Sequence, residues 1–392
     1  MQRRTFLKTA LAGVSLLAIS AVALAADDVV KVGLILPMTG PFASTGKQIE
    51  AAVKLYIAEH GDTVAGKKIE VILKDDTNVA DITKRLATEL VVNDGVKFLA
   101  GFGLTPLALA AAPISAQAKV PQIVMAAGTS IITEKSPYIV RTSFTTPQKA
   151  SVMGEWAAKN GVKNAYTIVS DFAPGHDSEK WFKDSFTKGG GTIAGEARVP
   201  MANPDFAPFL QRAADAKPEA IFVFVPSGAG AIFAKQYVER GLDKSGIKLI
   251  ATGDVTDDDI LNGYGDAALG IITADPYSTA HPSAKNAGYV AAFTKANPSL
   301  RPNFMSVGGY DGMHVIYEAL KKTNGNSDGD ALMAAIKGMA FESPRGPISI
   351  DAETRDIVQN VYLRKVEKKD GQLYNIEFAT VEAVKDPGKT PK

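Results

Sequence analysis

Small hydroxyl side chains and glycines follow two short apolar runs of the chain, and these loops carry its clearest chemical pattern. Thr105-Pro106 comes after the run that ends at Gly101, and Ala126-Ala127-Gly128-Thr129-Ser130 comes after Ile123–Met125. Both loops offer hydroxyl groups and backbone N–H donors, and neither carries a charged side chain. Two such loops on one edge of a sheet favour a site that holds a carboxylate through neutral donors, without a buried arginine. For each loop alone, a helix start or a turn is the simpler interpretation.

A second candidate site lies where the first apolar run meets a helix. Residues Val32–Leu36 predict a buried strand, segment 37–41 breaks it with proline and glycine, and Ser44 or Thr45 is expected to cap the next helix. Backbone N–H groups at such a junction suit a small anionic ligand. An ordinary strand–helix connection explains the pattern equally well.

The motifs of common enzyme chemistry do not fit the sequence. Segment 40–47, GPFASTGK, has one residue too many between its glycines for a phosphate-binding loop, and Gln48 stands where Ser or Thr should bind magnesium. There is no GxSxG nucleophile motif, and the four histidines form no HExxH pair. His314 is expected in the core, and Asp257-Asp258-Asp259 is expected to open a helix after Thr256. We predict no cofactor, no metal and no enzymatic activity.

Length and composition narrow the class of protein. A chain of 392 residues predicts two domains, and a net charge of +1 gives no reason to expect nucleic acid or an anionic membrane as a partner. Residues 1–26 have the features of a signal peptide, with Arg3-Arg4 for twin-arginine export and Ala23-Leu24-Ala25 for cleavage. General export and an uncleaved anchor are the alternatives. Without cysteine the chain has no disulfide and no lipidated N-terminus, so we expect a free periplasmic protein.

Short apolar strands alternate with amphipathic helices, which predicts parallel sheets with helices on both faces. Strands are expected at 29–36, 69–73, 97–101, 121–125, 164–169, 192–199, 219–225, 247–251 and 270–274. Helices are expected at 46–59, 80–93, 106–118, 148–159, 177–188, 206–215, 228–240, 256–262, 283–296, 304–322 and 329–337. Runs 358–367 and 373–380 around Lys369-Asp370-Gly371 predict an antiparallel hairpin.

Breaks in this alternation predict that the chain passes three times between two lobes. The crossings are expected at Phe144–Pro147, at Asp275–Tyr277 and near Ile350-Asp351. The predicted organisation is a first lobe of residues 27–146 plus 276–350, a second lobe of residues 147–275 plus 351–384, and a flexible tail at 385–392.

Several segments resemble the periplasmic solute-binding proteins of ABC transporters, in the branch of the Leu/Ile/Val-binding proteins. The similar segments are VGLILPMTGPFASTGKQIEAA, LKDDTNVADITKRLATELVVNDGVKFLAGFG, PYIVRTSFTTPQ and GDAALGIITADPY. The resemblance covers nearly all of the chain after the leader. It implies a type I periplasmic binding fold, an α/β protein of two Rossmann-like lobes that close on a ligand. It also implies a monomer with an ABC permease and an ATPase as partners.

The resemblance assigns a carboxylate site to the first lobe. Thr105 matches the family's hydroxyl position, Ala127 its carbonyl position, and Thr129 its position with both a hydroxyl and an amide. Thr45 matches a position that often holds an aromatic residue. The candidate ligand-binding residues are Thr45, Leu104, Thr105, Ala127, Gly128, Thr129, Phe172, Pro174, Pro226 and Asp254.

The second lobe departs from the family's amino-acid binders. Pro174 stands at one tyrosine position, another falls near Pro226 or Ser227, and the acid that pairs with the ligand ammonium falls at Gly253 or Asp254. A buried ammonium needs a charge partner and hydrogen-bond acceptors. We therefore expect a small carboxylate ligand without an ammonium group, an aromatic acid of benzoate type. A branched-chain or other hydrophobic amino acid is the alternative ligand, and periplasmic ligand sensing is the alternative role.

Overall fold

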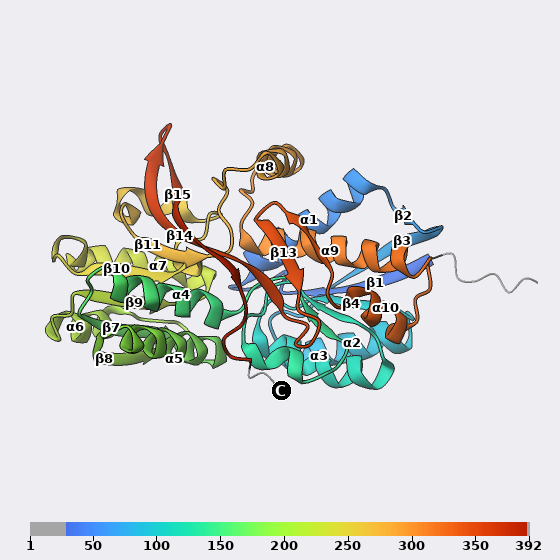
Figure 1. Cartoon of the computed structure of the whole chain (residues 1–392), viewed down its shortest axis with the longest axis horizontal. Coiled ribbons are helices and arrows are strands. Elements are labelled where there is room, and N and C mark those ends of the chain that lie inside the picture. Colours follow the sequence, from blue (N-terminus) through green and yellow to red (C-terminus); the bar gives the residue numbers. More distant parts are fainter. Residues whose placement is uncertain (1–28, 390–392) are drawn as a thin grey trace, which may run out of the picture.

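The chain folds into two α/β lobes that lie side by side (Figure 1). The computed structural model describes residues 29–389, so the expected signal peptide lies outside the described residues. We call the part built on the six-stranded sheet the first lobe and the part built on the nine-stranded sheet the second lobe. Within residues 29–389, none of the helices has the length and apolar character that a membrane span needs.

In the first lobe, β1 (Val29–Leu36) lies parallel between β3 (Lys67–Asp75) and β4 (Phe98–Gly101). The sheet order is β2-β3-β1-β4-β5-β6, with β2 at Thr63–Val64, β5 at Gln122–Val124 and β6 at Ile139–Arg141. The helices are α1 (Ala43–His60), α2 (Ala80–Val92), α3 (Thr105–Ala118), α8 (Ala284–Ala296), α9 (Phe304–Lys322) and α10 (Gly329–Ile336).

Alternation along β1 explains why this strand is an unbroken apolar run. Val32 and Leu34 pack with α1 and α9 in one cluster, whereas Ile35 packs with α2 and α3 in another. Successive side chains of a strand point to opposite faces, so a strand covered on both faces is apolar throughout.

The second lobe repeats this plan around β7 (Asn164–Ser170), which lies parallel between β8 (Thr192–Val199) and β9 (Ala220–Phe224). Its sheet order is β12-β13-β14-β11-β10-β9-β7-β8, with β15 paired to β14. The other strands are β10 (Lys248–Thr252), β11 (Ile272–Asp275), β12 (Ala340–Ser343), β13 (Gly346–Ile350), β14 (Ile357–Lys369) and β15 (Gln372–Val384). Its helices are α4 (Thr146–Lys159), α5 (Ala173–Lys188), α6 (Ala207–Asp215) and α7 (Ser227–Glu239).

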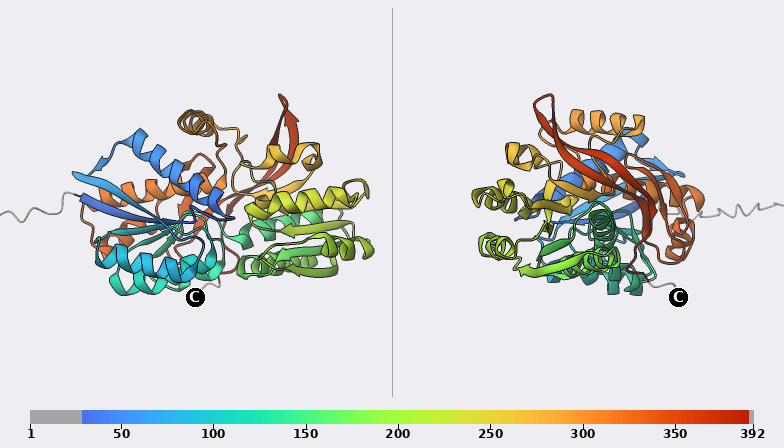
Figure 2. Two further views of the ribbon diagram at one scale, coloured as in Figure 1. Left: turned by 180° about the vertical axis from the view of Figure 1, so that it is seen from behind. Right: turned by 60° about the vertical axis from the view of Figure 1, so that its left-hand side comes forward.

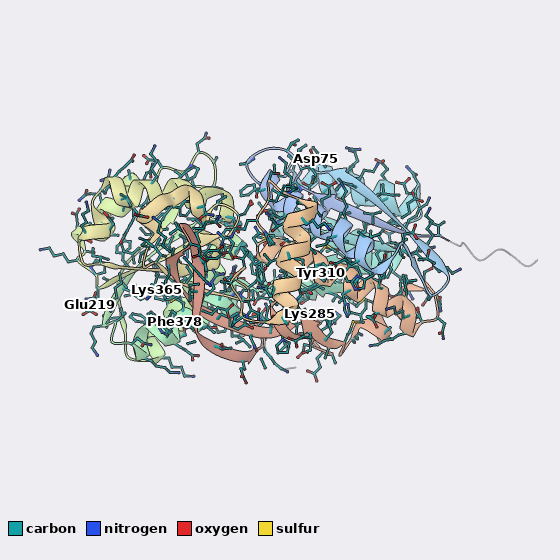
Figure 3. All side chains as sticks on the ribbon, turned by 90° about the horizontal axis from the view of Figure 1, so that it is seen from above. Asp75, Glu219, Lys285, Tyr310, Lys365 and Phe378 are labelled. Carbon is teal, nitrogen blue, oxygen red and sulfur yellow. The ribbon has the colours of Figure 1, made fainter. Side chains whose placement is uncertain are left out.

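The expected hairpin at the end of the chain is confirmed as β14 and β15. Asp370 and Gly371 connect the two strands with φ values of 49° and 78°. This backbone conformation suits Asp-Gly in a tight hairpin turn. Figure 3 shows Lys365 and Phe378 of the hairpin on the second-lobe side and Asp75 on the first lobe. The Phe378 ring lies 5.9 Å from that of Trp156 on α4, which ties the hairpin to the lobe.

Both sheets reverse their strand order at a central strand, β1 in the first lobe and β7 in the second. Ligands of such open sheets bind at this point, beyond the carboxyl ends of the strands. The segments after β1 and β4 and those after β7 and β9 are therefore the places where a site is expected. The two views of Figure 2 show the two lobes with the connecting segments between them.

Buried arginines hold the connecting segments together. Arg141, at the end of β6, donates to Asp356 before β14 at 2.5 Å. Arg345 donates to the carbonyl oxygens of Thr142 and Ser143, each at 2.6 Å. Both guanidinium groups are almost completely buried, so each needs these partners to offset the loss of water.

The predicted division into lobes stays a prediction. Strands β12 and β13, which were placed in the first lobe, hydrogen-bond into the sheet of the second. The side chains of Phe341 and Ile350 nevertheless pack in the first-lobe cluster. Residues 340–350 therefore belong to the second lobe by their hydrogen bonds and to the first lobe by their packing.

The segment that was expected to be a flexible tail begins with residues that pack against the first lobe. Asp386 is 6% exposed and accepts hydrogen bonds from the Ser130 hydroxyl at 2.7 and 2.9 Å. The Lys389 ammonium pairs with Glu134 at 3.0 Å. Residues 385–389 therefore differ from that expectation, and 390–392 lie outside the described residues.

Two local predictions are wrong. The helix expected at 256–262 is replaced by two 3₁₀ segments, η3 (Gly253–Thr256) and η4 (Leu261–Ala268). The intervening Asp257-Asp258-Asp259 forms tertiary hydrogen bonds instead of opening a helix: Asp257 accepts from Asn303 at 3.0 Å and Asp258 from Asn375 at 2.9 Å. The expected caps also fail, because Phe42 and Leu104 hold the N-cap positions of α1 and α3.

Candidate functional site

A cavity lies between the lobes at the carboxyl ends of the central strands. The empty space between its walls, including the part that is open to solvent, is about 410 Å³. Its first-lobe wall contains Phe42, Thr45, Gly103, Leu104, Thr105, Ala126, Ala127, Gly128, Phe144 and Met305, and its second-lobe wall contains Thr146, Phe172, Pro174, Phe224, Pro226, Ser227 and Asp254. The walls are mostly apolar with a few hydroxyl groups, which is typical of a site for a small organic ligand.

The structure brings the predicted site residues together. All of them line this cavity except Thr129, whose hydroxyl oxygen lies 2.7 Å from that of Thr105. Thr105 therefore uses its hydroxyl on Thr129 instead of capping α3. That these residues contact a ligand stays a prediction. Five further residues of the cavity wall were not predicted, because no sequence motif marks them: Phe42, Phe144, Thr146, Phe224 and Met305.

Helices of both lobes begin at the cavity. They include α1 at Ala43, α3 at Thr105, α5 at Ala173 and α7 at Ser227, and each starts at or beside a residue of the cavity wall. The first N–H groups of a helix have no partner inside the helix, and they carry the positive end of its dipole. Helix starts from both lobes thus make the cavity favourable for an anion.

The loop that follows β5 presents its donors to the cavity. Arg141 donates to the carbonyl oxygen of Ala127 and, at 2.7 Å, to that of Thr129. The N–H groups of Gly128 and Thr129 have no acceptor among residues 29–389. The arginine was not expected from the sequence, because it acts from behind the loop through carbonyl groups. The charge of Arg141 is paired with Asp356. Arg141 therefore orients the loop and adds little positive charge to the cavity.

Glycine is required at position 128 for packing. A Cβ atom there would lie 2.7 Å from the Phe144 ring and 3.2 Å from the Thr146 methyl group. Only glycine lets the loop approach this ring so closely.

The one acidic residue of the cavity wall is already paired. Asp254 lies 2.5 Å from the ammonium group of Lys149 on α4, which also lies 3.2 Å from Asp275. The Lys149 side chain is fully buried and lies 3.8 Å from the centre of the Phe144 ring. Burial raises the pKa of Asp275, and the charge of Lys149 opposes this shift. Asp254 rather than Gly253 reaches the cavity, and its charge is not free to pair with a ligand.

Hydrogen bonds join the two lobes around the cavity. The Ser44 hydroxyl on α1 donates to Asp259, and the N–H of Ser130 donates to Asp177 on α5 at 3.1 Å. Burial raises the pKa of the Asp177 carboxyl. Such contacts enclose the cavity between the lobes.

The fold and this enclosed cavity define a class of protein, the two-lobed binding proteins that hold a small molecule between hinged domains. Within residues 29–389 no group of His, Cys, Asp or Glu is arranged to hold a metal ion. The sequence profile of the periplasmic binding protein family matches residues 29–372. The chain belongs to this family, as a type I periplasmic binding protein of the Leu/Ile/Val-binding branch.

Relatives of known name or structure agree with this membership. The Leu/Ile/Val-binding protein homolog 6 of Brucella melitensis biotype 1 is 47% identical over 97% of each chain. A solute-binding protein of an ABC transporter from Rhodopseudomonas palustris BisB5, solved with 3,4-dihydroxybenzoic acid, is 69% identical with a TM-score of 0.91, and the match covers 93% of this chain and 100% of that one. Another from R. palustris, solved with 4-hydroxybenzoate, is 40% identical with a TM-score of 0.89, over 92% and 99% of the two chains.

Proposed function

We propose that this protein binds a small aromatic carboxylate of benzoate type between its lobes and delivers it to an ABC import permease and its ATPase. The observation that carries the proposal is the ion pair of Asp254 with Lys149, at 2.5 Å. An amino-acid ligand needs a partner for its ammonium group, and the only acidic side chain of the described cavity wall is neutralised.

The other parts of the cavity suit the two ends of an aromatic acid. The N–H groups of Gly128 and Thr129 are donors that suit a carboxylate. The hydroxyl groups of Thr105 and Thr129 share one hydrogen bond, which leaves one hydroxyl proton to donate. Rings line the remaining space, and those of Phe172 and Phe224 stack with centres 6.0 Å apart. Aromatic side chains stack favourably with a ligand ring. The aromatic acids bound by the two R. palustris relatives support the same ligand class for this chain.

Calorimetric titration of the ligand-stripped protein tests this function. We expect saturable binding of benzoate or 4-hydroxybenzoate and no heat from leucine. Tight leucine binding with no response to any benzoate would contradict the proposal. A thermal-shift screen across amino acids and aromatic acids is an independent check, because a tight ligand raises the melting temperature by mass action.

We also propose that the protein acts in the periplasm after twin-arginine export. Its membership of the family and the Arg3-Arg4 pair support this location. Replacing both arginines by lysine should keep the precursor in the cytoplasm, whereas export of the variant at the normal rate would indicate the general pathway.

A further inference from the structure

The second-lobe wall carries one hydroxyl group without a hydrogen bond of standard geometry. Ser227 is the first residue of α7, lines the cavity and is 9% exposed. Its hydroxyl oxygen forms no hydrogen bond of standard geometry with any described residue. A buried polar group without a partner is costly, so native proteins seldom leave one unless a ligand or water completes it.

The position of Ser227 is fixed by contacts with both lobes. A Cβ atom added to the next residue, Gly228, would lie 2.8 Å from the carbonyl oxygen of Pro41 in the first lobe. The start of α7 therefore fits closely against the turn before α1. The two lobes thus lie against each other beside Ser227, which lines the cavity.

Asp257 does not supply the missing hydrogen bond. Its carboxyl group is buried and the Ser227 hydroxyl lowers its pKa, but no hydrogen bond of standard geometry joins the two groups. Asn303 donates to one Asp257 oxygen at 3.0 Å, and the N–H of Asp259 donates to the other at 3.2 Å. Asp257 is held in place by these donors and does not line the cavity itself.

We propose, on the basis of the function proposed above, that Ser227 binds a hydroxyl group on the ring of the aromatic acid. A serine hydroxyl both donates and accepts, so it matches a phenolic hydroxyl in either direction. A charged substituent does not fit, because the described cavity wall has no unpaired charged side chain.

The geometry of the walls selects the ring position of this hydroxyl group. The carboxylate donors around Thr105 and Gly128 belong to the first lobe, whereas Ser227 belongs to the second. When an aromatic acid binds between the walls, its carboxylate points to the first-lobe wall, and the opposite edge of its ring points to the second-lobe wall. The substituent recognised by Ser227 is therefore at ring carbon 3 or 4, and the cavity prefers 3- or 4-hydroxybenzoate to benzoate.

Calorimetric titration of benzoate, 3-hydroxybenzoate and 4-hydroxybenzoate tests the inference. For the unchanged protein, at least one hydroxylated acid should bind about 10-fold more tightly than benzoate. Ser227→Ala should remove this preference, so that the hydroxylated acids bind no more tightly than benzoate does, and Ser227→Thr, which keeps the hydroxyl group, should restore part of it. Ser245→Ala, at an exposed serine of the second lobe, is the matched control and should change neither affinity.

If the unchanged protein binds all three acids equally, or if Ser227→Ala weakens them all by one factor, the inference is wrong although the proposed function stands. If none of the three acids binds, the proposed function itself fails.

Discussion

The ammonium nitrogen of Lys149 lies 2.5 Å from a carboxylate oxygen of Asp254 and 3.2 Å from one of Asp275. The lysine comes from the start of α4, just after the first crossing, whereas Asp254 follows β10 and Asp275 ends β11. One buried cation thus joins the first crossing to two strand ends of the second lobe. Lys149 thereby neutralises Asp254, the acidic residue with which the ammonium group of an amino-acid ligand would pair.

Removing this cation should destabilise the whole protein. Lys149→Met leaves Asp254 buried without its cation and leaves Asp275 paired only with Arg364, at 3.3 Å. Breaking a buried ion pair in this way costs about 3–5 kcal/mol. Urea unfolding measures the change in the free energy of unfolding. Lys159→Met on the same helix is the control, because the Lys159 side chain is 76% exposed and its pair with Glu155 contributes little. A loss below about 1 kcal/mol for Lys149→Met would contradict the role given to the pair.

Thr129→Ala should weaken binding of an aromatic carboxylate by about 1–3 kcal/mol, because a charge-assisted hydrogen bond is lost. Thr105→Ala should have a similar effect. The double variant should lose less than the sum, since the two hydroxyl oxygens lie 2.7 Å apart and act as one unit. Calorimetry measures each affinity, with Thr88→Ala on the exposed face of α2 as the control. Unchanged affinity in Thr129→Ala would remove the proposed carboxylate site.

Gly128→Ala should abolish tight binding by displacing the loop. The new Cβ atom would lie 2.7 Å from the Phe144 ring, so either the loop or the ring must move. We expect at least a 10-fold loss of affinity, about 1.4 kcal/mol. Gly288→Ala in α8 is the control, because no atom lies within 4 Å of its added Cβ and alanine favours a helix. Normal affinity in Gly128→Ala would show that the loop tolerates the shift.

The elements that were predicted well are those whose patterns depend on local burial. The predicted strand 29–36 is confirmed as β1, 192–199 as β8, and helix 304–322 as α9. In each of these elements, the spacing of apolar residues indicates which faces are buried, and this spacing is visible in a short stretch of sequence. The cavity loops at Thr105 and Gly128 were located for the same reason, since they follow such strands.

The parts that failed depend on partners distant in the sequence. Asp257 was predicted to open a helix, because acidic residues favour that position. In the structure it accepts a hydrogen bond from Asn303, the N-cap residue of α9. Lys149 and Arg141 gave no local sign of being buried, since a charged residue is normally exposed. Their partners Asp254 and Asp356 lie 105 and 215 positions away. Only the assembled fold shows that these charges are paired inside.

Asp257 should make the stability of the protein depend on pH. Burial raises the pKa of its carboxyl group from 3.8 to about 8. Between these values the folded protein binds a proton that the unfolded chain does not, so the free energy of unfolding should fall as pH rises from about 4 to about 8, by up to about 1.4 kcal/mol per pH unit. Burial also raises the pKa of Asp177 and Asp386, and these groups contribute in the same direction.

The contribution of Asp257 is isolated by comparing the protein with Asp257→Asn in urea unfolding at pH 5, 7 and 9. The amide resembles the protonated carboxyl group but does not ionise, so the variant should lose less stability than the unchanged protein as pH rises. The two stability curves should therefore converge or cross toward pH 9. Asp243→Asn, at an exposed position of the same lobe, should leave the slope unchanged. Parallel curves for Asp257→Asn and the unchanged protein would show that Asp257 is ionised throughout this range in the folded state.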